Sequence, residues 1–596
     1  MIALDIESGS GPRRVDLLDY LEPAQEERAH EDEYAWIKAI RHLHVDGEPF
    51  RSRFTFRGDS LWWFAELYLH KEQAILTALR MLSAFDTLVE RDRPLAVRHV
   101  SGGYPGVVAQ AAAARKVRYE GRGWSAPAAD AVRMDVRAMG LALAARASRL
   151  RTRRASRQHA RVAAFVHRAF WRSDAGDGSA ESYIGPVLQA IESRVPPESL
   201  QYVGIGPRSN FRARKWWDAL RPHDEKGIIP IESYAPALAL AASRSVFRER
   251  HRVRQRLWDS AELRAHAVIR GCDCWPLVRT QLAGIALLQF PWSARAMDEA
   301  AAALAALEPD VAVTYAEAGG WGRALALECR RRNVPLAGLQ HGFIYRHWLN
   351  YRHEPDELLA DPRNSSDTGF PLPASTLLFD DYAARHLTTS GGFPSGALQI
   401  TGSARLDELN AAVHRLDASA IAQALAAAGA TPDRPLVLFA AKEKEARRAL
   451  PALIAAMRAM AGVQLAIKPH PAETPDVYRH AVSGSNNVTI LSATAPLPPL
   501  LAAARAVVTV NSTVAIDAIA LGLPVVVIGL PNNLTPFVDA GVMAGATSAE
   551  EIQAALARLL YDQEFLSKFQ RNRVTGAMGG SAARSAEAIL RLAKAN

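Results

Sequence analysis

The sequence has 596 residues, of which 49% are hydrophobic and 22% are charged, and its formal net charge is +9. A chain of this length is too long for one hydrophobic core, so we expect about two to four domains. The composition is that of a soluble globular protein rather than of a disordered chain, and the charge favours anionic partners in general, namely nucleotides, anionic glycans, lipid head groups or nucleic acid.

The cysteines and the apolar runs indicate the compartment. Cys272, Cys274 and Cys329 form neither a disulfide framework nor the four-ligand spacing of a zinc site. No apolar run reaches the roughly 20 residues that a membrane-spanning helix needs, and the first residues lack the apolar core of a signal peptide. We therefore expect a cytoplasmic protein.

The first half is predicted to be a Rossmann-like domain at residues 34–360, after a poorly ordered, polar lead at residues 1–33. Strand and helix patterns alternate along it, which is typical of a parallel sheet covered by helices on both faces. Two of its strand patterns end shortly before Glu317 and before His341. Asp59 stands just before an aromatic helix start.

A basic helical insertion is predicted at residues 125–161. Its closely spaced arginines are Arg146, Arg149, Arg151, Arg153, Arg154, Arg157 and Arg161. Two interpretations stay open, a solvated helical face or a surface that docks on an anionic membrane or glycan. Docking would make the protein peripheral at the inner face of the cell membrane. No nucleic-acid motif or aromatic interleaving accompanies the arginines, so nucleic acid is not an expected partner.

The second half, residues 361–596, is predicted to be another Rossmann-like domain that begins near the polar stretch Asp361–Phe370. Its strand patterns begin with Thr376–Phe379 and Leu398–Gly402 and continue from Leu436 onward. The two halves repeat an architecture without repeating a sequence. We therefore expect two α/β domains that face each other across a cleft.

Polar residues follow three strand patterns of the second half. Lys468 and His470 emerge in a Lys-Pro-His-Pro turn, Ser512 and Thr513 precede a buried helix, and Lys442 follows a third strand. Ligands of open α/β sheets bind beyond the carboxyl ends of the strands, and hydroxyls at a helix start attract phosphate. Alone, Ser512 or Thr513 could be an N-cap and Lys442 part of a solvated turn. Because these residues all follow strands of one predicted sheet, at the same edge of that sheet, together they predict an anion-binding site.

The same residues carry a family resemblance. The Lys-Pro-His-Pro turn, followed by Ser-Thr-Val-x-x-Asp-Ala-x-x-x-Gly-x-Pro-Val from Ser512, resembles the carboxyl-terminal domain of GT-B glycosyltransferases that build bacterial surface polysaccharides. This group contains CDP-glycerol glycerophosphotransferases, polysialyltransferases and capsule Kdo transferases. The resemblance runs from about Gln340 to Leu560, and it implies that His470, Ser512 and Thr513 hold the nucleotide phosphate of the donor.

The resemblance also implies an acceptor side. The Gln-His-Gly element around His341 resembles the Trp-His-Gly element of CDP-glycerol glycerophosphotransferases, whose histidine is taken as the base. Because Gln340 replaces the tryptophan, Glu317 and Asp59 remain rival bases. Asp517 stands where related proteins carry an acidic residue that meets the donor ribose or sugar, although a structural role is almost as well supported.

These observations predict a GT-B glycosyltransferase that moves a sugar or sugar-like group from a nucleotide-activated donor to a surface glycan or lipid-linked glycan. The CMP or CDP class of donor is implied by the resemblance alone. No DxD-like motif is evident, so we expect neither a metal nor another cofactor. An enzyme of UDP-N-acetylglucosamine 2-epimerase type and a non-catalytic glycan- or nucleotide-binding protein remain alternatives.

Overall fold

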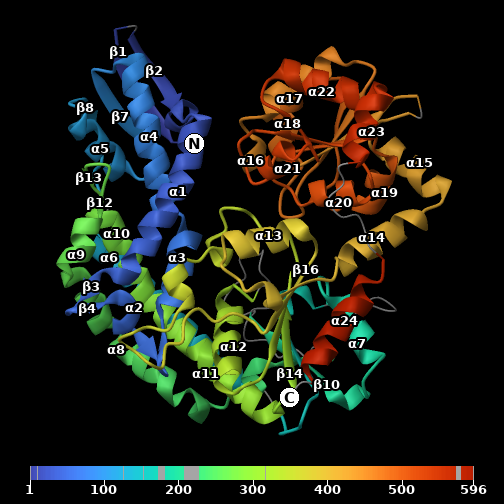
Figure 1. Ribbon diagram of the computed structural model, residues 1–596. Coiled ribbons are helices and arrows are strands. Elements are labelled where there is room, and N and C mark those ends of the chain that lie inside the picture. Colours follow the sequence, from blue (N-terminus) through green and yellow to red (C-terminus); the bar gives the residue numbers. More distant parts are fainter. Residues whose placement is uncertain are drawn as a thin grey trace.

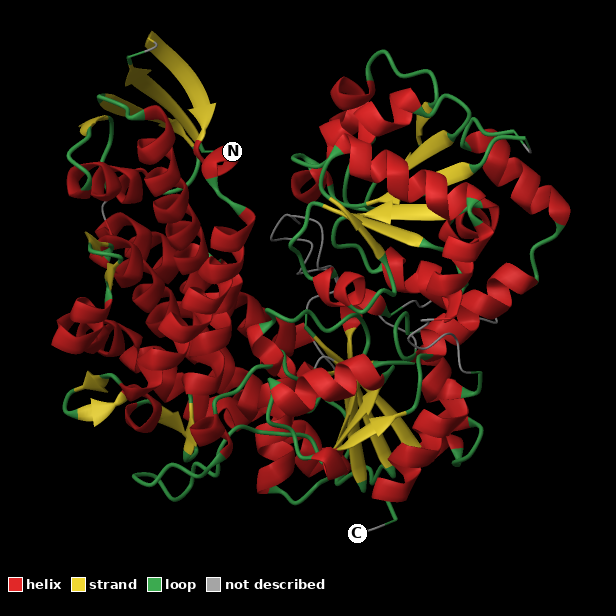
Figure 2. Ribbon diagram, turned by 45° about the horizontal axis from the view of Figure 1, so that its top comes forward, coloured by secondary structure: helices red, strands yellow, loops and turns green. Residues whose placement is uncertain are grey.

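The computed structural model describes residues 2–9, 11–124, 127–151, 154–171, 181–206, 227–315, 317–431, 433–571 and 579–594. The chain forms an N-terminal arm and two α/β domains, each built on a sheet of parallel strands (Figure 1). Figure 2 shows each of the two larger sheets with helices on both of its faces.

The arm carries a four-stranded sheet in the order β2-β1-β7-β8 and a helical bundle. Its strands are β1 (Ala3–Ser8), β2 (Gly11–Asp16), β7 (Ala96–Ser101) and β8 (Arg118–Glu120). Its helices include α1 (Pro23–Ala39), α2 (Phe50–Arg53), α3 (Trp62–Glu72), α4 (Ala74–Asp92) and α5 (Pro105–Ala114). Short hairpins add β3 (His44–Val45) with β4 (Glu48–Pro49), and β5 (Thr55–Phe56) with β6 (Asp59–Ser60).

The prediction of a poorly ordered lead at residues 1–33 is wrong. Leu4 and Ile6 alternate with polar residues along β1 and are buried in the arm's core. This period-two pattern is that of a strand with one face against a core. The Glu22 side chain then begins α1 with a capping box, so the polar composition reflects one solvated face of ordered elements.

The basic insertion corresponds to α6 (Pro127–Arg151), which connects the arm to the first large sheet. Further helices of the arm are α8 (Ala241–Asp259), α9 (Ala261–His266) and α10 (Trp275–Gly284), with the hairpin β12 (Val268–Ile269) and β13 (Cys272–Asp273). Helix α6 packs beside α10 (Figure 1). Of the predicted arginines, Arg153 and the Arg151 side chain lie outside the described residues.

The first Rossmann-like domain contains a seven-stranded parallel sheet in the order β11-β10-β9-β14-β15-β16-β17. Its strands are β9 (Val162–His167), β10 (Leu200–Ile205), β11 (Ile229–Pro230), β14 (Val311–Tyr315), β15 (Leu336–Leu339), β16 (Ser375–Leu378) and β17 (Leu398–Ile400). Its helices include α7 (Gly185–Glu192), α11 (Phe290–Leu307), α12 (Gly320–Arg331), α13 (Asp381–Thr389) and α24 (Ser581–Leu592). The residues of β14 and β15 are all buried, as expected for strands covered on both faces.

The second Rossmann-like domain has a six-stranded parallel sheet in the order β20-β19-β18-β21-β22-β23. Its strands are β18 (Leu436–Ala440), β19 (Gln464–Lys468), β20 (Val488–Ile490), β21 (Ala506–Thr509), β22 (Val525–Ile528) and β23 (Ala544–Ala546). Its helices are α15 (Ala418–Ala427), α16 (Glu443–Ala446), α17 (Leu450–Ala459), α18 (Asp476–Val482), α19 (Leu497–Ala503), α20 (Val514–Ala520), α21 (Thr535–Asp539), α22 (Ala549–Tyr561) and α23 (Gln563–Arg571). In both sheets the strand order reverses beside the first strand, which creates a crevice at the carboxyl ends. The two predicted α/β domains are confirmed.

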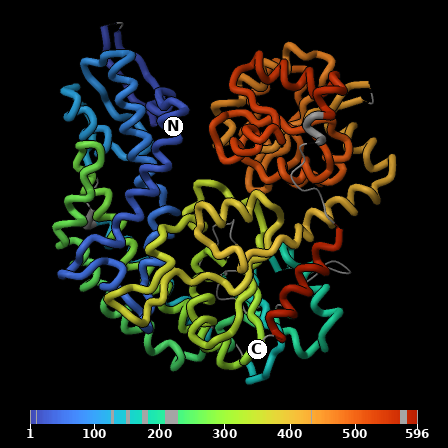
Figure 3. Tube along the Cα trace, viewed as in Figure 1, coloured from blue at the N-terminus to red at the C-terminus, as the bar shows by residue number. Residues whose placement is uncertain are grey.

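The predicted boundary at residues 360 and 361 is wrong, because β16 and β17 pair within the first sheet. The polar stretch before them packs on the arm instead, where Arg51 pairs with the fully buried Asp367 (3.0 Å). The chain passes from the first α/β domain to the second along α14 (Ala404–His414). After the second domain it returns to the first, where α24 packs against α7 (Figure 3). The Asp407 carboxylate joins the two crossings by accepting hydrogen bonds from the Gly579 and Ser581 N–H groups (3.0 and 2.9 Å).

Candidate functional site

Three of the predicted anion-binding segments lie side by side at the carboxyl edge of the second sheet. They follow β19, β18 and β21, which are neighbours in that order. The Thr509 hydroxyl ties two of these ends together, because it donates to the Ala440 carbonyl (2.6 Å) and accepts from the Ser512 N–H (3.2 Å). The structure thus brings together the segments that carry Lys442, His470 and Ser512.

The half-buried His470 side chain has a defined tautomer. Its Nδ1 accepts a hydrogen bond from the Ala472 N–H (3.1 Å), so a neutral ring carries its proton on Nε2. Burial lowers the pKa of His470, and the charge of nearby Lys442 lowers it further. The neutral ring therefore presents an Nε2–H donor at this edge.

Glu473 holds the loops that carry Lys442 and His470, a role that the sequence motif did not suggest. Its carboxylate accepts hydrogen bonds from the Glu443 N–H (2.9 Å) and from the Tyr478 hydroxyl (3.2 Å). The exposed Lys442 ammonium lies 3.9 Å from Glu445, which is a loose contact for an ion pair. Lys442 therefore keeps freedom to meet an anionic ligand.

Lys468 has a different role from the one predicted. Its buried ammonium donates to the Ala493 carbonyl (2.7 Å) and the Pro469 carbonyl (3.2 Å). Because two main-chain carbonyls hold the group, Lys468 braces the end of β19. This arrangement favours a structural role over direct contact with a donor phosphate.

Ser512 and Thr513 lie at the start of α20, as predicted. The Ser512 hydroxyl accepts a hydrogen bond from the Val514 N–H (3.3 Å), a capping contact that leaves its own proton available. Thr513 is exposed. The helix has only seven residues, so the two hydroxyls, rather than a helix dipole, are the groups that suit an anion.

On the first sheet, His341 follows the end of β15. Its ring lies 5.3 Å from Tyr183 and 5.2 Å from Tyr315, measured between ring centroids. Burial lowers the pKa of His341 to about 4, so the imidazole is neutral at pH 7 and able to accept a proton. Gln340, which replaces the tryptophan of the related motif, accepts from the Phe379 N–H (2.8 Å) and donates to the Gly342 carbonyl (2.9 Å).

Glu317 follows β14, one strand away from His341. The side chain is 3% exposed, and neither carboxylate oxygen has a hydrogen bond of good geometry among the described residues. Burial raises the pKa of Glu317 to about 7, against the stabilising influence of the Tyr351 hydroxyl. Gly338 makes room for this carboxyl, because a Cβ there would stand 2.7 Å from the Glu317 Cγ.

Asp59 lies beside the last turn of α12, at the end of that helix that is far from Glu317. Its carboxylate pairs with Arg330 (3.0 Å) and with Arg331, in the last turn of α12. Glu317 precedes the first turn of that helix, and its 12 residues span about 18 Å. Asp59 therefore stabilises the contact between the arm and α12, and this position removes it from the candidate bases.

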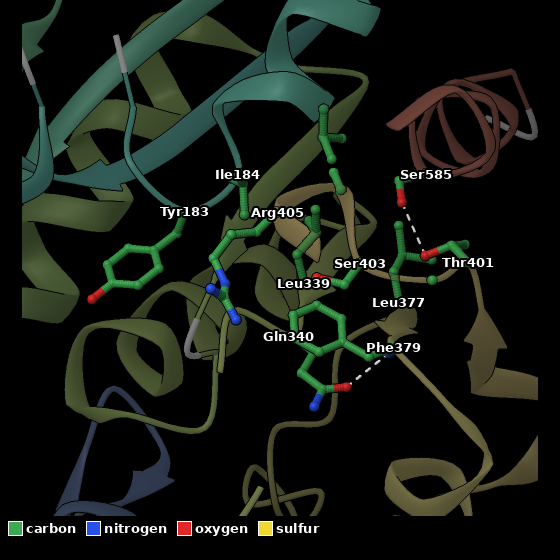
Figure 4. A pocket seen from close by; sticks show the side chains of 13 residues that line it. Tyr183, Ile184, Leu339, Gln340, Leu377, Phe379, Thr401, Ser403, Arg405 and Ser585 are labelled. Carbon is green, nitrogen blue, oxygen red and sulfur yellow. Dashed lines mark hydrogen bonds between the residues drawn. The ribbon is translucent and has the colours of Figure 1, made fainter. Parts of the chain in front are cut away.

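A small pocket lies at the carboxyl edge of the first sheet, between Tyr183 and the start of α14 (Figure 4). Its lining residues include Gln340, Phe379, Thr401, Ser403, Arg405 and Ser585. The Arg405 guanidinium reaches across to the second domain and pairs with the buried Asp517 (2.5 Å). This partner favours a structural role for Asp517 over contact with a donor ribose.

Aromatic side chains also join the His341 loop to the second domain. Phe343, two residues after His341, lies 5.3 Å from Phe537 of α21, and Tyr382 of α13 lies 4.7 Å from the same ring. Together with the ion pair, these contacts place the carboxyl edges of both sheets at one interdomain junction. His341 follows a strand of the first sheet and His470 follows a strand of the second.

Glu27, Glu31 and His347 could together hold a metal ion, since their ligand atoms lie within 4.8 Å of one another. However, Arg346 pairs with Glu27 (2.6 Å) and Arg352 pairs with Glu31 (2.8 Å). These guanidinium groups already neutralise both carboxylates. The chemistry of this cluster therefore favours an ion-pair network between α1 and the loop after β15.

Within the described ranges, no helix combines the length and the apolar character that crossing a bilayer would require.

Comparisons with known proteins identify one family model. Residues 438–551 match the model described as "Capsule polysaccharide biosynthesis protein". No curated protein matches the chain.

Solved structures with a similar backbone are distant in sequence. UDP-GlcNAc 2-epimerase from Neisseria meningitidis has 12% identity and a TM-score of 0.45, over 73% of this chain and 100% of that one. UDP-GlcNAc 2-epimerase from Methanocaldococcus jannaschii has 12% identity and a TM-score of 0.42, over 73% and 99%. The calicheamicin glycosyltransferase CalG4 has 15% identity and a TM-score of 0.41, over 74% and 99%. Similarity this weak carries no information about activity, whereas the family match covers the strand ends that bear Lys442, His470 and Ser512.

Proposed function

We propose that the protein is a metal-independent glycosyltransferase of surface-polysaccharide synthesis, which moves a sugar or sugar-like group from a nucleotide-activated donor to a glycan or lipid-linked glycan. The observation that carries the proposal is the grouping of Lys442, His470 and Ser512 at adjacent strand ends, within the residues that match the capsule family. The neutral His341 follows a strand of the first sheet.

The second domain binds the donor. The Nε2–H of His470 and the hydroxyls of Ser512 and Thr513 donate hydrogen bonds to phosphate oxygens, and the Lys442 ammonium adds a positive charge. Charge accumulates on the phosphate as the sugar leaves. Preorganised donors of this kind stabilise such charge more strongly than water does.

The first domain binds the acceptor and supplies the base. The neutral imidazole of His341 takes the proton of the acceptor hydroxyl as the oxygen bonds to the anomeric carbon. The bond between that carbon and the donor phosphate breaks, and the nucleotide leaves with the electron pair. Glu317, whose pKa is raised to about 7, is the rival base, but the deep burial of its carboxyl group favours the half-buried His341 as the group that meets an acceptor.

The CMP or CDP class of donor rests on the family resemblance. A thermal-shift comparison of CMP, CDP, UDP and GDP tests it, because a ligand that binds only the folded state raises the melting temperature. We expect the largest increase with a cytidine nucleotide. An equal response to all four, or to none, would contradict the donor assignment.

Turnover distinguishes the proposed activity from its alternatives. A glycosyltransferase releases free nucleotide only when donor and acceptor glycan are both present. A 2-epimerase converts a UDP-sugar without any acceptor, and a binding protein shows a thermal shift without turnover of any donor. Release of nucleotide across a panel of capsule-type acceptors would support the proposal, whereas epimerised UDP-sugar formed without an acceptor would exclude it.

A further inference from the structure

Helix α6 has an apolar stripe on its solvent side. Val132, Val136, Met139 and Leu143 are 63%, 59%, 41% and 67% exposed. At 3.6 residues per turn these four positions fall within an arc of about 60° and extend for about 17 Å along the helix. They form one continuous surface, which we call the α6 stripe.

Another face of α6 packs on the protein through Ala131, Ala138 and the partly buried Met134. Ala131 is 1% exposed and contacts Ala283 of α10 and Leu287 of the π-helical turn that follows it. Ala138, two turns further, is 5% exposed. A helix of a soluble domain normally turns its large apolar residues inward and its polar residues outward. Here the four large apolar residues of the stripe face out, and the packing of the domain itself does not explain them.

Positive charge lies along both sides of the stripe. Arg146 flanks one side, Arg133 and Arg137 flank the other, and all three are exposed. The acidic groups of the helix are paired, Asp130 with Arg133 and Asp135 with Arg250 (2.7 Å). The face that carries the stripe is therefore apolar along its centre and positive at its edges.

We propose that the α6 stripe docks the protein on an anionic lipid surface. Apolar side chains on such a helix enter the boundary between head groups and acyl chains, while arginines beside them meet lipid phosphates. A second copy of this chain fits less well, because pairing the same surface with itself brings arginine edges together with no exposed carboxylate from α6 between them. An anionic lipid surface is therefore complementary both to the apolar stripe and to its positively charged edges.

Co-sedimentation with vesicles tests the proposal on the full-length protein. The probes are vesicles of phosphatidylcholine alone and vesicles that contain roughly 30% phosphatidylglycerol, at about 0.1 M salt. We expect the wild-type protein to sediment with the anionic vesicles and to remain largely in solution with the neutral ones. Absence from the anionic vesicles would overturn the proposal.

Variants identify the surface. The double variant Val136→Gln/Leu143→Gln removes apolar surface without adding charge, and glutamine has good helix propensity, so the helix is preserved. We expect vesicle affinity to fall at least about tenfold. The matched control is Val477→Gln/Tyr561→Gln, which replaces side chains that are 44% and 62% exposed in the second domain. The control should bind like the wild type. Equal binding by the two double variants would place the contact elsewhere and refute the assignment.

Charge and self-association complete the test. Arg137→Gln/Arg146→Gln should weaken binding to anionic vesicles by roughly fivefold per arginine and leave the weak binding to neutral vesicles unchanged. Light scattering tests the alternative that a second copy of this chain covers the α6 stripe. If Val136→Gln/Leu143→Gln converts a dimer to a monomer and leaves vesicle binding intact, the stripe is an interface between copies and the lipid proposal is wrong.

Discussion

Arg405 and Asp517 form an ion pair between the first turn of the crossing helix α14 and the buried side of α20, with a separation of 2.5 Å. Asp517 is 2% exposed, whereas the Arg405 side chain is 31% exposed. The pair therefore fixes the second domain against α14, beside Tyr183 and the pocket of the first domain. It belongs to the mechanical connection between the two α/β domains.

Asp517→Asn should lower the free energy of unfolding by about 2 kcal/mol, because it leaves the Arg405 guanidinium without its charged partner. We expect the nucleotide-induced thermal shift to survive. Denaturant unfolding with and without nucleotide measures both quantities. Asp476→Asn, which breaks an exposed pair with Arg479, is the control and should change stability little. Loss of the nucleotide shift at unchanged stability would instead show that Asp517 contacts the donor.

His470→Ala should abolish the nucleotide-induced thermal shift and leave the melting temperature of the free protein nearly unchanged. The half-buried ring accepts a hydrogen bond from its own loop through Nδ1, and the proposal assigns its Nε2–H to a phosphate oxygen. His480→Ala, at an exposed position on α18, is the matched control and should keep the full shift. A normal shift in His470→Ala would remove the ring from the donor site.

The pH dependence of kcat/KM distinguishes the two remaining bases. A base must be deprotonated, and the pKa of His341 is about 4 while that of Glu317 is about 7. With His341 as the base, kcat/KM should rise through about pH 4 and stay level from about pH 5 to pH 8. An acid limb near pH 7 would favour Glu317.

His341→Gln provides an independent check of this assignment. We expect it to keep the nucleotide shift, because the ring belongs to the first domain, and to reduce transfer at least about a hundredfold, the lower range for a general base. Turnover close to that of the wild type would exclude His341 as the base.

Lys442→Met should weaken nucleotide binding, whereas Lys468→Met should lower the stability of the protein. Lys442 is exposed and free to meet an anion, so its loss should weaken nucleotide affinity and leave stability unchanged. Lys468 holds two carbonyls at the end of β19, and its loss should lower the free energy of unfolding by about 1–3 kcal/mol. Nucleotide titration and denaturant unfolding of both variants check the contrast. An affinity loss confined to Lys468→Met would restore Lys468 as a contact of the donor phosphate.

The sequence predicted the grouping of the anion-binding segments because it depends on local rules. Short apolar runs before Lys442, His470 and Ser512 predict parallel strands, and the carboxyl ends of parallel strands share one edge. The direction of a side chain depends on distant partners instead. Nothing near Lys468 in sequence indicates that the Ala493 carbonyl takes its ammonium, and nothing near Asp59 indicates Arg330.

The domain boundary was mispredicted for a related reason. An apolar strand pattern shows that a strand forms but not which sheet it joins, so β16 and β17 were assigned to the wrong domain. The polar stretch before them resembles a linker in composition. In the folded protein its charges pair with the arm, as in the contact between Arg51 and the buried Asp367 (3.0 Å). Composition alone cannot distinguish solvated charges from buried pairs.

Glu317→Gln should stabilise the protein increasingly as the pH rises. The folded-state pKa of about 7 exceeds the ordinary value of 4.5, so between these values the folded state keeps a proton that the unfolded state releases. The wild type therefore loses stability from about pH 4.5 upward, by up to roughly 3 kcal/mol above pH 7. Glutamine is neutral throughout and lacks this loss.

We therefore expect equal stability of wild type and Glu317→Gln near pH 4.5, where both side chains are neutral and of similar shape, and an advantage of up to roughly 3 kcal/mol for the variant at pH 8. Urea unfolding at several pH values measures the difference. Glu198→Gln, at an exposed position, controls for the loss of a carboxylate as such. A difference that is the same at pH 4.5 and pH 8 would mean that burial does not hold Glu317 protonated and would contradict its raised pKa.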